Sequence, residues 1–268
     1  MLEKLQTEIK LRGLSEMTLK TYMFYNRKFL EFIKKEPAEV TEDDIKSFLA
    51  DLISKGAKNS TLSLVKSSLF FYYVELLKKK MEIKTPKISK KVPVVLTREE
   101  VKRVLDTTKN FKHRLILQFL YSTGTRLSEC INFKVGDLEL EQKVAWVRSG
   151  KGDKDRMVIL SDKLVSEIKQ HLASRSINSD YLFTVKERKM SRRNVQKIVN
   201  NAAKAAGVTK KVSPHTLRHS FATHLLESGV DIRKIQILLG HSNLNTTQIY
   251  TSVSATELKK IINPLDTL

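Results

Sequence analysis

One stretch interrupts an otherwise helical pattern: Val144-Ala145-Trp146-Val147-Arg148-Ser149-Gly150-Lys151-Gly152-Asp153-Lys154-Asp155-Arg156-Met157-Val158-Ile159. Apolar and β-branched residues flank a polar, glycine-containing centre. This arrangement is typical of two antiparallel strands joined by a hairpin turn. The stretch therefore predicts a β-hairpin, with Lys151 at its tip, inside a domain that is otherwise made of helices.

Residues 97–268 are predicted to form that mostly helical domain. Apolar residues recur at helical spacing on both sides of the hairpin. Helix starts are marked by Thr97 with Glu100, Ser191 and Asp231, and helix ends by Gly207, Gly229 and Gly240. The predicted helices span about 98–108, 112–122, 126–132, 162–174, 192–206, 215–228, 232–239, 244–250 and 255–262. The sequence thus predicts helices around one small antiparallel β-sheet.

Residues 1–80 predict a smaller domain of four helices. Ser15, Thr41 with Asp44, and Ser60 are signals for the starts of the second, third and fourth helices. The fourth helix is predicted to run through Leu76. It contains four consecutive aromatic residues, 70–73, which could stack on nucleic-acid bases. Their place in a helical apolar pattern favours the hydrophobic core instead.

Residues 81–96 are predicted to be a basic linker. Seven lysines lie between Lys78 and Lys91, Pro86 and Pro93 interrupt the chain, and the apolar periodicity stops. Such a lysine-rich segment is usually just solvated. Between two domains that both face DNA, it would lie along the phosphate backbone.

The charge of the chain predicts a polyanionic partner. The 268 residues are 41% hydrophobic, which is enough for a packed core, and the formal net charge is +20. Residues 1–90 contribute +6 and residues 91–268 contribute +14, so both domains are basic. Binding to nucleic acid is favoured because each neutralised phosphate releases counterions. The alternative is a soluble protein with a lysine-rich face.

Other features indicate a soluble, cytoplasmic protein. The single cysteine, Cys130, excludes an intramolecular disulfide and a CxxC zinc site, and its apolar helical surroundings predict a buried thiol. No signal peptide is recognisable, and no apolar run reaches the 18 or so residues of a membrane span. We therefore expect no membrane association.

Four strings in residues 97–268 carry chemically active side chains. They are Thr123–Glu129 with Arg126, Gly150–Gly152 with Lys151, His215-Thr216-Leu217-Arg218, and Leu238–His241 followed by Tyr250. Together they offer two guanidiniums, one ammonium, two imidazoles and one phenol. This set suits the attack of a tyrosine on a phosphodiester.

Each group has a task in such a reaction. A phenol, with a pKa near ~10, is largely neutral at pH 7, and nearby cations favour the phenolate. Two arginine forks can bind the non-bridging oxygens, and a lysine can protonate the departing 5′-oxygen. The cations do the electrostatic work, so the reaction requires neither a metal ion nor another cofactor. The phosphotyrosyl linkage retains the energy of the broken bond, so rejoining needs no ATP.

Each string taken alone has another interpretation. Gly150–Gly152 lacks the GxxxxGK[ST] spacing of a nucleotide-binding loop and lies between strands. His215 and His219 are spaced like zinc ligands, but the glutamate of HExxH is missing and Arg218 lies between them. The other candidates alone would be a surface arginine, a capping histidine and a core tyrosine. Their joint occurrence favours catalysis.

The four strings, in this order, resemble the tyrosine site-specific recombinases of the integrase type. The resemblance covers nearly the whole chain: residues 1–80 resemble the SAM-like core-binding domain and residues 97–268 the catalytic domain. A histidine at position 241 and the lack of an extra arm-binding domain favour the Xer subgroup. The roles that the family implies are phosphate clamps for Arg126 and Arg218, the leaving-group acid for Lys151, phosphate contacts for His215 and His241, the nucleophile for Tyr250, and support of the arginine site for Glu129.

The resemblance also implies an assembly. Such enzymes act as homotetramers on double-stranded DNA with paired inverted-repeat half-sites and exchange strands through a Holliday junction. A C-terminal segment docks on a neighbouring subunit. Here the apolar residues Leu258, Ile261, Ile262 and Leu265 could do so, or could pack on their own domain.

The implied function is site-specific DNA recombination, with Xer-type resolution of chromosome or plasmid dimers as its biological role. Three alternatives remain open at this point: the integrase of a mobile element, a nicking-closing topoisomerase that uses the same phosphotyrosyl chemistry, and a non-catalytic DNA-binding module. The complete six-residue set argues against the last of these.

Overall fold

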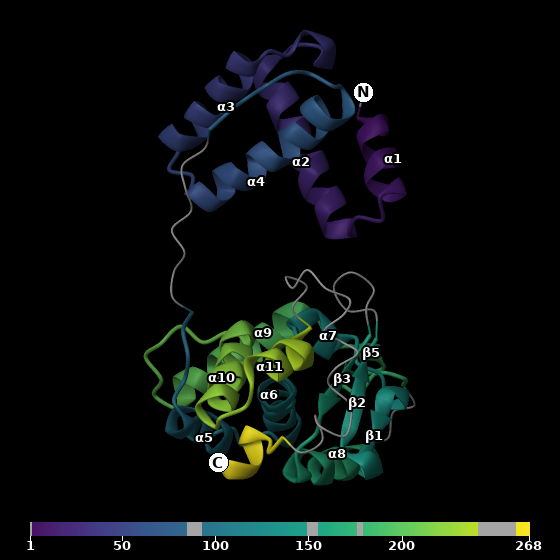
Figure 1. Cartoon of the computed structure of the whole chain (residues 1–268), viewed down its shortest axis with the longest axis vertical. Helices are drawn as coiled ribbons and strands as arrows, with labels where there is room; N and C mark the ends of the chain where they lie inside the picture. The colour runs from purple at the N-terminus through teal and green to yellow at the C-terminus, as the bar shows by residue number, and fades with distance from the viewer. Residues whose placement is uncertain (1, 85–92, 149–154, 176–178, 241–260) are drawn as a thin grey trace. The chain divides into compact units, whose positions relative to one another are not determined.

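The computed structural model describes residues 2–84, 93–148, 155–175, 179–240 and 261–268. The chain divides into two compact units, Met1–Lys91 and Val92–Leu268, each with its own hydrophobic core (Figure 1). Helices dominate both units, and small antiparallel sheets lie in the second. The predicted fold class is therefore confirmed. Within the described ranges, every helix is too short or too polar to cross a lipid bilayer.

Four α-helices form the N-terminal unit: α1 (Glu3–Leu11), α2 (Glu16–Ile33), α3 (Glu42–Ser54) and α4 (Asn59–Phe70), with a short 3-10 helix, Pro37–Glu39, before α3. Ser15 caps α2 by accepting a hydrogen bond from the Thr18 N–H at 3.1 Å. Thr41 and Asp44 form the predicted capping box of α3. These polar caps fix where α2 and α3 begin. The predicted start signal of the fourth helix, Ser60, is wrong as a cap: α4 begins at Asn59 and has no side-chain cap.

The fourth helix differs from its prediction. The α-helix ends at Phe70 and continues as a π-helix, η2 (Phe71–Leu76), in which the Leu77 N–H donates to the Tyr72 carbonyl at 2.9 Å. Phe71, Tyr72 and Tyr73 in this wider turn are all buried. The prediction that these aromatic residues belong to the core is confirmed. The prediction of a single α-helix through Leu76 is wrong, because the backbone changes to the π pattern at Phe71.

Both described ends of the predicted linker pack against a unit. Ile83 is buried in the N-terminal core, and its carbonyl accepts a hydrogen bond from the Lys66 ammonium. Leu96 is buried in the second core, and its N–H donates to Ser220 Oγ at 2.9 Å. Residues 85–92 lie outside the described ranges. Each unit thus includes a few residues of the stretch 81–96.

The helices of the second unit surround α6. They are α5 (Arg98–Asp106), α6 (Phe111–Thr123), α7 (Leu127–Ile131), α8 (Asp162–Ser174), α9 (Arg192–Ala205), α10 (Pro214–Glu227) and α11 (Ile232–Leu239). Residues 115–123 of α6 are all buried, with α10 on one side and the sheet and α8 on the other (Figure 1). The predicted helices agree with these bounds to within two residues at either end. Those predicted at 244–250 and over most of 255–262 lie outside the described residues.

The predicted β-hairpin is confirmed. Strands β2 (Val144–Val147) and β3 (Arg156–Ile159) are antiparallel, with Val147 opposite Arg156, and the tip 149–154 lies outside the described ranges. The prediction of one small sheet was incomplete. A short strand β1 (Leu138–Glu139) pairs with β2, and β4 (Thr184–Val185) pairs with β5 (Arg188–Lys189) in a second sheet. Two-residue strands are too short to produce a recognisable alternation of apolar and polar residues.

The C-terminal residues contact their own unit. Leu265, in the 3-10 helix Pro264–Thr267, is buried in the second core, and Asn263 Nδ2 donates to the Ser122 carbonyl at 2.8 Å. Ile262 is 70% exposed, and Leu258 lies outside the described residues. At least the last part of the predicted apolar strip therefore packs on its own domain. Cys130 is buried as predicted, and this burial raises the pKa of its thiol.

Candidate active site

The turn between α6 and α7 places one guanidinium at the edge of the core. Gly124 ends α6 with φ of +58°, and a Cβ at this position would lie 2.7 Å from side-chain atoms of Leu239 and Phe221. Both the left-handed backbone and the close packing therefore require glycine. Arg126 follows as the N-cap residue of α7, and 20% of its side chain remains exposed.

Glu129, in the first turn of α7, is buried between two arginines. Its Oε2 accepts from the Arg126 backbone N–H at 2.7 Å, and its Oε1 accepts from Arg126 Nη1 at 2.8 Å. Arg156 donates to the same carboxylate from the other side, at 2.9 Å from Nη1 and 2.6 Å from Nη2. Burial opposes ionisation, but the bonds from Arg156 and Arg126 outweigh it and hold the pKa of Glu129 at about 2. Glu129 is therefore ionised at neutral pH.

Arg218, on α10, is the second guanidinium that the sequence singled out. Ser213 caps this helix and Pro214 begins it. Arg218 is 4% exposed, and it donates to the Gly124 carbonyl at 2.5 Å and to the Leu239 carbonyl at 2.6 Å. Burial, together with the charges of Arg126 and Arg156, lowers the pKa of Arg218 to about 9. The guanidinium thus still carries its charge at neutral pH.

Three successive carbonyls at the end of α11 hold the three arginines. The Leu238 carbonyl accepts from Arg156 Nε at 2.9 Å, the Leu239 carbonyl from Arg218 Nη2, and the Gly240 carbonyl from Arg126 Nη2 at 2.9 Å. Carbonyls at the end of a helix lack partners within the helix and carry the negative end of its dipole. The end of α11 therefore orders the three guanidiniums.

The cluster has an excess of positive charge. Among the described residues, Arg126, Arg156 and Arg218 surround one carboxylate, that of Glu129. Arg126 and Arg218 each donate from two nitrogens in the described bonds, although a guanidinium has five N–H groups. The unused donors and the unbalanced charge suit a bound oxyanion.

A hollow of about 550 Å³ adjoins Arg126. Its other lining residues include Trp146 in β2, Arg148 just after β2, and Lys134 and Tyr181, which pair with each other in an isolated β-bridge. Cationic and aromatic side chains, together with Asp137, thus border the hollow beside Arg126. This hollow gives Arg126 access to a bound molecule.

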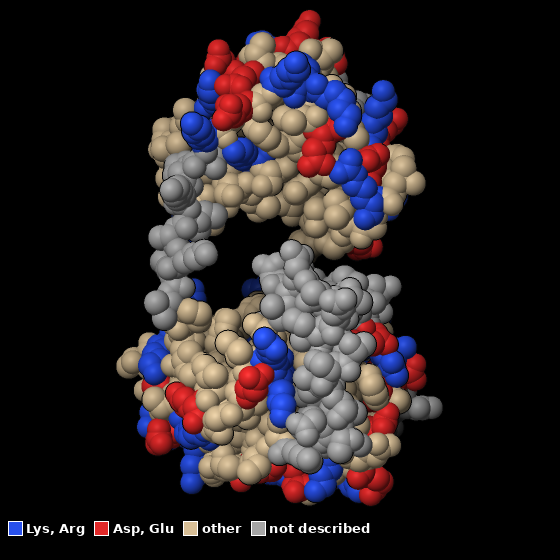
Figure 2. All heavy atoms as spheres, in the orientation of Figure 1, with Lys and Arg blue, Asp and Glu red and all other residues tan. Residues whose placement is uncertain are grey.

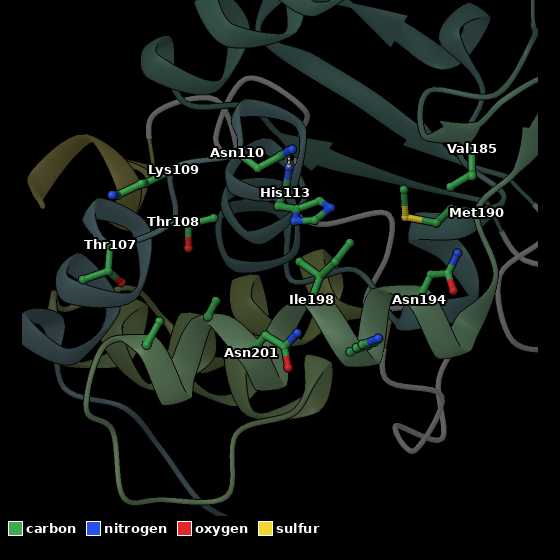
Figure 3. Close-up of a pocket in the computed structure, with 13 residues that line it drawn as sticks. Thr107, Thr108, Lys109, Asn110, His113, Val185, Met190, Asn194, Ile198 and Asn201 are labelled. Atoms are coloured by element: carbon green, nitrogen blue, oxygen red, sulfur yellow. Dashed lines mark hydrogen bonds between the residues drawn. The ribbon is translucent and has the colours of Figure 1, made fainter.

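A second pocket, of about 420 Å³, lies elsewhere in the unit (Figure 3). It is bordered by the α5–α6 connection, Met190 and α9, and Asn110 and His113 on its wall are joined by the N-cap hydrogen bond of α6. None of the candidate residues in the described ranges lines it. It is therefore separate from the arginine cluster.

The structure brings together only part of the predicted set. Arg126 and Arg218 share the end of α11, with Glu129 beside them. His215 is exposed in the first turn of α10, the helix that carries Arg218. The three remaining candidates lie outside the described residues: Lys151, His241 and Tyr250. Within the described ranges, no group of three or more His, Cys, Asp or Glu side chains is arranged to hold a metal ion.

Sequence reasoning missed Arg156. This residue is the first of β3, but in the sequence it follows the polar run Asp153-Lys154-Asp155 and was not singled out. A charged residue directly before the apolar Met157-Val158-Ile159 was the available signal. Its partner Glu129 lies 27 positions earlier in the chain, and nothing in the local pattern pointed to that carboxylate.

Comparison with known proteins assigns the chain to a class of enzymes. The description "Phage integrase family" applies to a sequence profile that matches residues 94–257, and "Phage integrase, N-terminal SAM-like domain" to one that matches residues 1–83. The chain belongs to the phage integrase family and is a tyrosine recombinase.

Within this family the chain is similar to Xer recombinases. It is 42% identical to the tyrosine recombinase XerA of Pyrococcus horikoshii, over 97% of this chain and 92% of that protein. A crystal structure of XerA recombinase, 33% identical, matches with a TM-score of 0.54 over 96% of this chain and 95% of that one. The XerH site-specific recombinase bound to difH substrate, in a pre-cleavage complex, is 27% identical and matches with a TM-score of 0.72 over 93% and 80% of the two chains.

Proposed function

We propose that Arg126 and Arg218 hold the scissile phosphate of double-stranded DNA in this site-specific recombinase. The observation that carries the proposal is the cluster of three guanidiniums around one carboxylate. In-line attack on phosphorus places negative charge on the non-bridging oxygens, and pre-ordered donors lower the barrier by stabilising that charge. The spare N–H groups of Arg126 and Arg218 supply such donors.

The remaining candidates complete the proposed mechanism. Tyr250 attacks the phosphorus and forms a 3′-phosphotyrosyl bond as the 5′-oxygen leaves. Lys151 protonates that oxygen, and His215 and His241 donate to the phosphate. Attack of a 5′-hydroxyl on the phosphotyrosyl bond then rejoins the strand and releases the tyrosine. In this scheme the reaction needs no metal ion and no ATP.

The proposed partner is double-stranded DNA with paired inverted-repeat half-sites, bound by a homotetramer. The net charge of +20 supports a phosphate-rich partner. On the face drawn in Figure 2, lysine and arginine side chains occur on both units, with acidic side chains among them. Residues 1–80 then serve as the core-binding half of a DNA clamp and residues 97–268 as the catalytic half. The XerH structure with difH substrate supports this partner.

We further propose that the enzyme acts in the cytoplasm and resolves chromosome or plasmid dimers. The similarity to XerA supports the Xer-type role. The family also contains integrases of mobile elements. The DNA sequence that the enzyme cuts therefore distinguishes dimer resolution from integration.

The test is to trap the covalent intermediate on genomic DNA. Sheared fragments are incubated with the wild-type protein, denatured, and those that remain attached to protein are sequenced and footprinted. We expect one inverted-repeat site, cut at a fixed position, and no adduct with Tyr250→Phe, which retains the ring but lacks the attacking oxygen. An adduct formed by Tyr250→Phe would overturn the choice of nucleophile. Relaxation of plasmids that lack the site would indicate a topoisomerase instead.

A further inference from the structure

Among the described residues, the Arg156 guanidinium donates from more of its nitrogens than that of either proposed clamp. All three of its guanidinium nitrogens donate to the protein: Nη1 and Nη2 to the Glu129 carboxylate, and Nε to the Leu238 carbonyl. The residue is 7% exposed. In the described bonds of Arg126 and Arg218, by comparison, two nitrogens each are used. Arg156 is therefore arranged to hold protein groups and not a ligand.

The groups that Arg156 contacts are those that receive the hydrogen bonds of Arg126. Arg126 donates from Nη1 to Glu129 and from Nη2 to the Gly240 carbonyl. Arg156 binds both oxygens of Glu129 in a side-on pair, which fixes the plane of the carboxylate as well as its position. It thereby aligns the first of the two acceptors.

The second acceptor is aligned by packing. A Cβ on Gly240 would lie 2.8 Å from Arg156 Cδ, so the backbone of Gly240 rests directly on the arginine side chain. The Nε bond to Leu238 fixes the same end of α11 two residues earlier. The position of the Gly240 carbonyl, with its φ of +62°, therefore depends on the place of Arg156.

We propose that Arg156 is a positioning residue for the recombination reaction: it holds Glu129 and Gly240, and through them sets the orientation of the Arg126 guanidinium. The proposal rests on the phosphate-binding role proposed above for Arg126. A displacement of a catalytic group by about 1 Å can cost ~10²-fold in rate, so an indirect effect of this kind is measurable. The competing explanation is structural, with Arg156 only neutralising a buried carboxylate.

The experiment compares four variants of the full-length protein on the duplex recovered by the genomic trap. Arg156→Gln removes the charge and the fork, and Arg156→Lys keeps the charge but cannot form the side-on pair. Glu129→Gln and the double variant Glu129→Gln/Arg156→Gln test whether Arg156 acts through Glu129. Single-turnover cleavage at saturating DNA, the Kd for the duplex and the Tm are measured for each.

Arg98→Gln is the matched control. Arg98 lies in the same unit and bonds to the His224 carbonyl, Ser228 Oγ and Thr267 Oγ1, away from the arginine cluster. Its loss should lower the Tm and leave cleavage below that temperature unchanged. This is the behaviour of an arginine with a purely structural role.

We expect Arg156→Gln and Arg156→Lys each to cleave at least ~10-fold more slowly while the Kd changes by less than about 3-fold. The double variant should cleave no more slowly than Glu129→Gln alone, because the two residues act in one chain of contacts. If Arg156→Gln fails to fold, Arg156→Lys alone is judged by the same criteria. Cleavage within about 2-fold of wild type, as for Arg98→Gln, or multiplicative losses in the double variant would overturn the proposal. Absence of an adduct with the wild-type protein would instead overturn the proposed function.

Discussion

The two units differ in whether they bury charged groups. In the described part of the N-terminal unit the buried polar residues are Asn26 and Ser68, and Asn26 Nδ2 donates to the Ser68 carbonyl and to its Oγ at 3.0 and 3.1 Å. The second unit buries amides and hydroxyls as well, and in addition the charged residues Glu129, Arg156 and Arg218. Amides and hydroxyls can be satisfied within a core at small cost, whereas buried like charges repel.

This difference separates groups that serve the fold from groups that serve the reaction. The Asn26–Ser68 contact joins α2 to α4 and so contributes to the packing of the N-terminal unit. Among the described residues, the arginine cluster places three positive charges around one buried negative charge. The packing of the core does not need this excess of positive charge. Substitutions at Asn26 should therefore lower stability and leave activity unchanged, whereas substitutions in the arginine cluster should lower activity with little loss of stability.

The largest effect is expected for Arg218→Met. This change removes a phosphate donor, so cleavage should fall by ~10²–10³-fold. It also removes a buried charge that Arg126 and Arg156 repel, so the free energy of unfolding should fall by less than about 1 kcal/mol. Single-turnover cleavage and urea unfolding measure the two quantities. A large loss of stability with normal cleavage below the Tm would show that Arg218 serves the fold and not the reaction.

An intermediate effect is expected on removal of the N-terminal unit. The fragment 93–268 retains Leu96, which packs in the second core, and loses one of the two basic units. It should bind the duplex at least ~10-fold more weakly, with a shallower dependence of Kd on salt, because fewer phosphates are neutralised. Titrations at several salt concentrations test this. An unchanged slope would indicate that the N-terminal helices do not bind DNA.

The smallest effect on activity is expected for Asn26→Ala. Loss of its bonds should lower the free energy of unfolding of the N-terminal unit by about 1–3 kcal/mol and leave cleavage chemistry unchanged. The only tryptophan of the chain, Trp146, lies in the second unit and reports on that unit separately. Circular dichroism should therefore show an earlier transition while Trp146 fluorescence does not. Asn59→Ala, at an exposed asparagine of α4, is the control. A shift in Trp146 fluorescence would show that the two units unfold together.

The sequence predicted what depends on local signals. The capping boxes at Thr41 and Thr97 and the glycine that ends α11, Gly240, mark helix ends through contacts within a few residues. The hairpin was predictable because each of its strands has four residues. The π-helix at Phe71–Leu76 was not, because the apolar residues of 70–76 also fit the spacing of an ordinary α-helix.

The candidate site was predictable only as a set of residue types. Arg126 and Arg218 are 92 positions apart in the chain, and what joins them is the end of α11, through the carbonyls of Leu239 and Gly240. Every residue has a carbonyl, so the sequence carries no mark of which ones will act. Arg156 was overlooked for a related reason, since its partner Glu129 is distant in the chain and the contact is fixed by the fold.

The use of main-chain acceptors at the end of α11 has a consequence for how this enzyme can vary. The side chains at positions 238 and 239 are free to drift among apolar residues that fit the core, because the arginines recognise only the backbone behind them. Gly240 has no such freedom, since a Cβ there would collide with Arg156. A protein engineer could therefore repack α11 extensively and keep the arginine cluster, provided that the helix still ends at the same glycine.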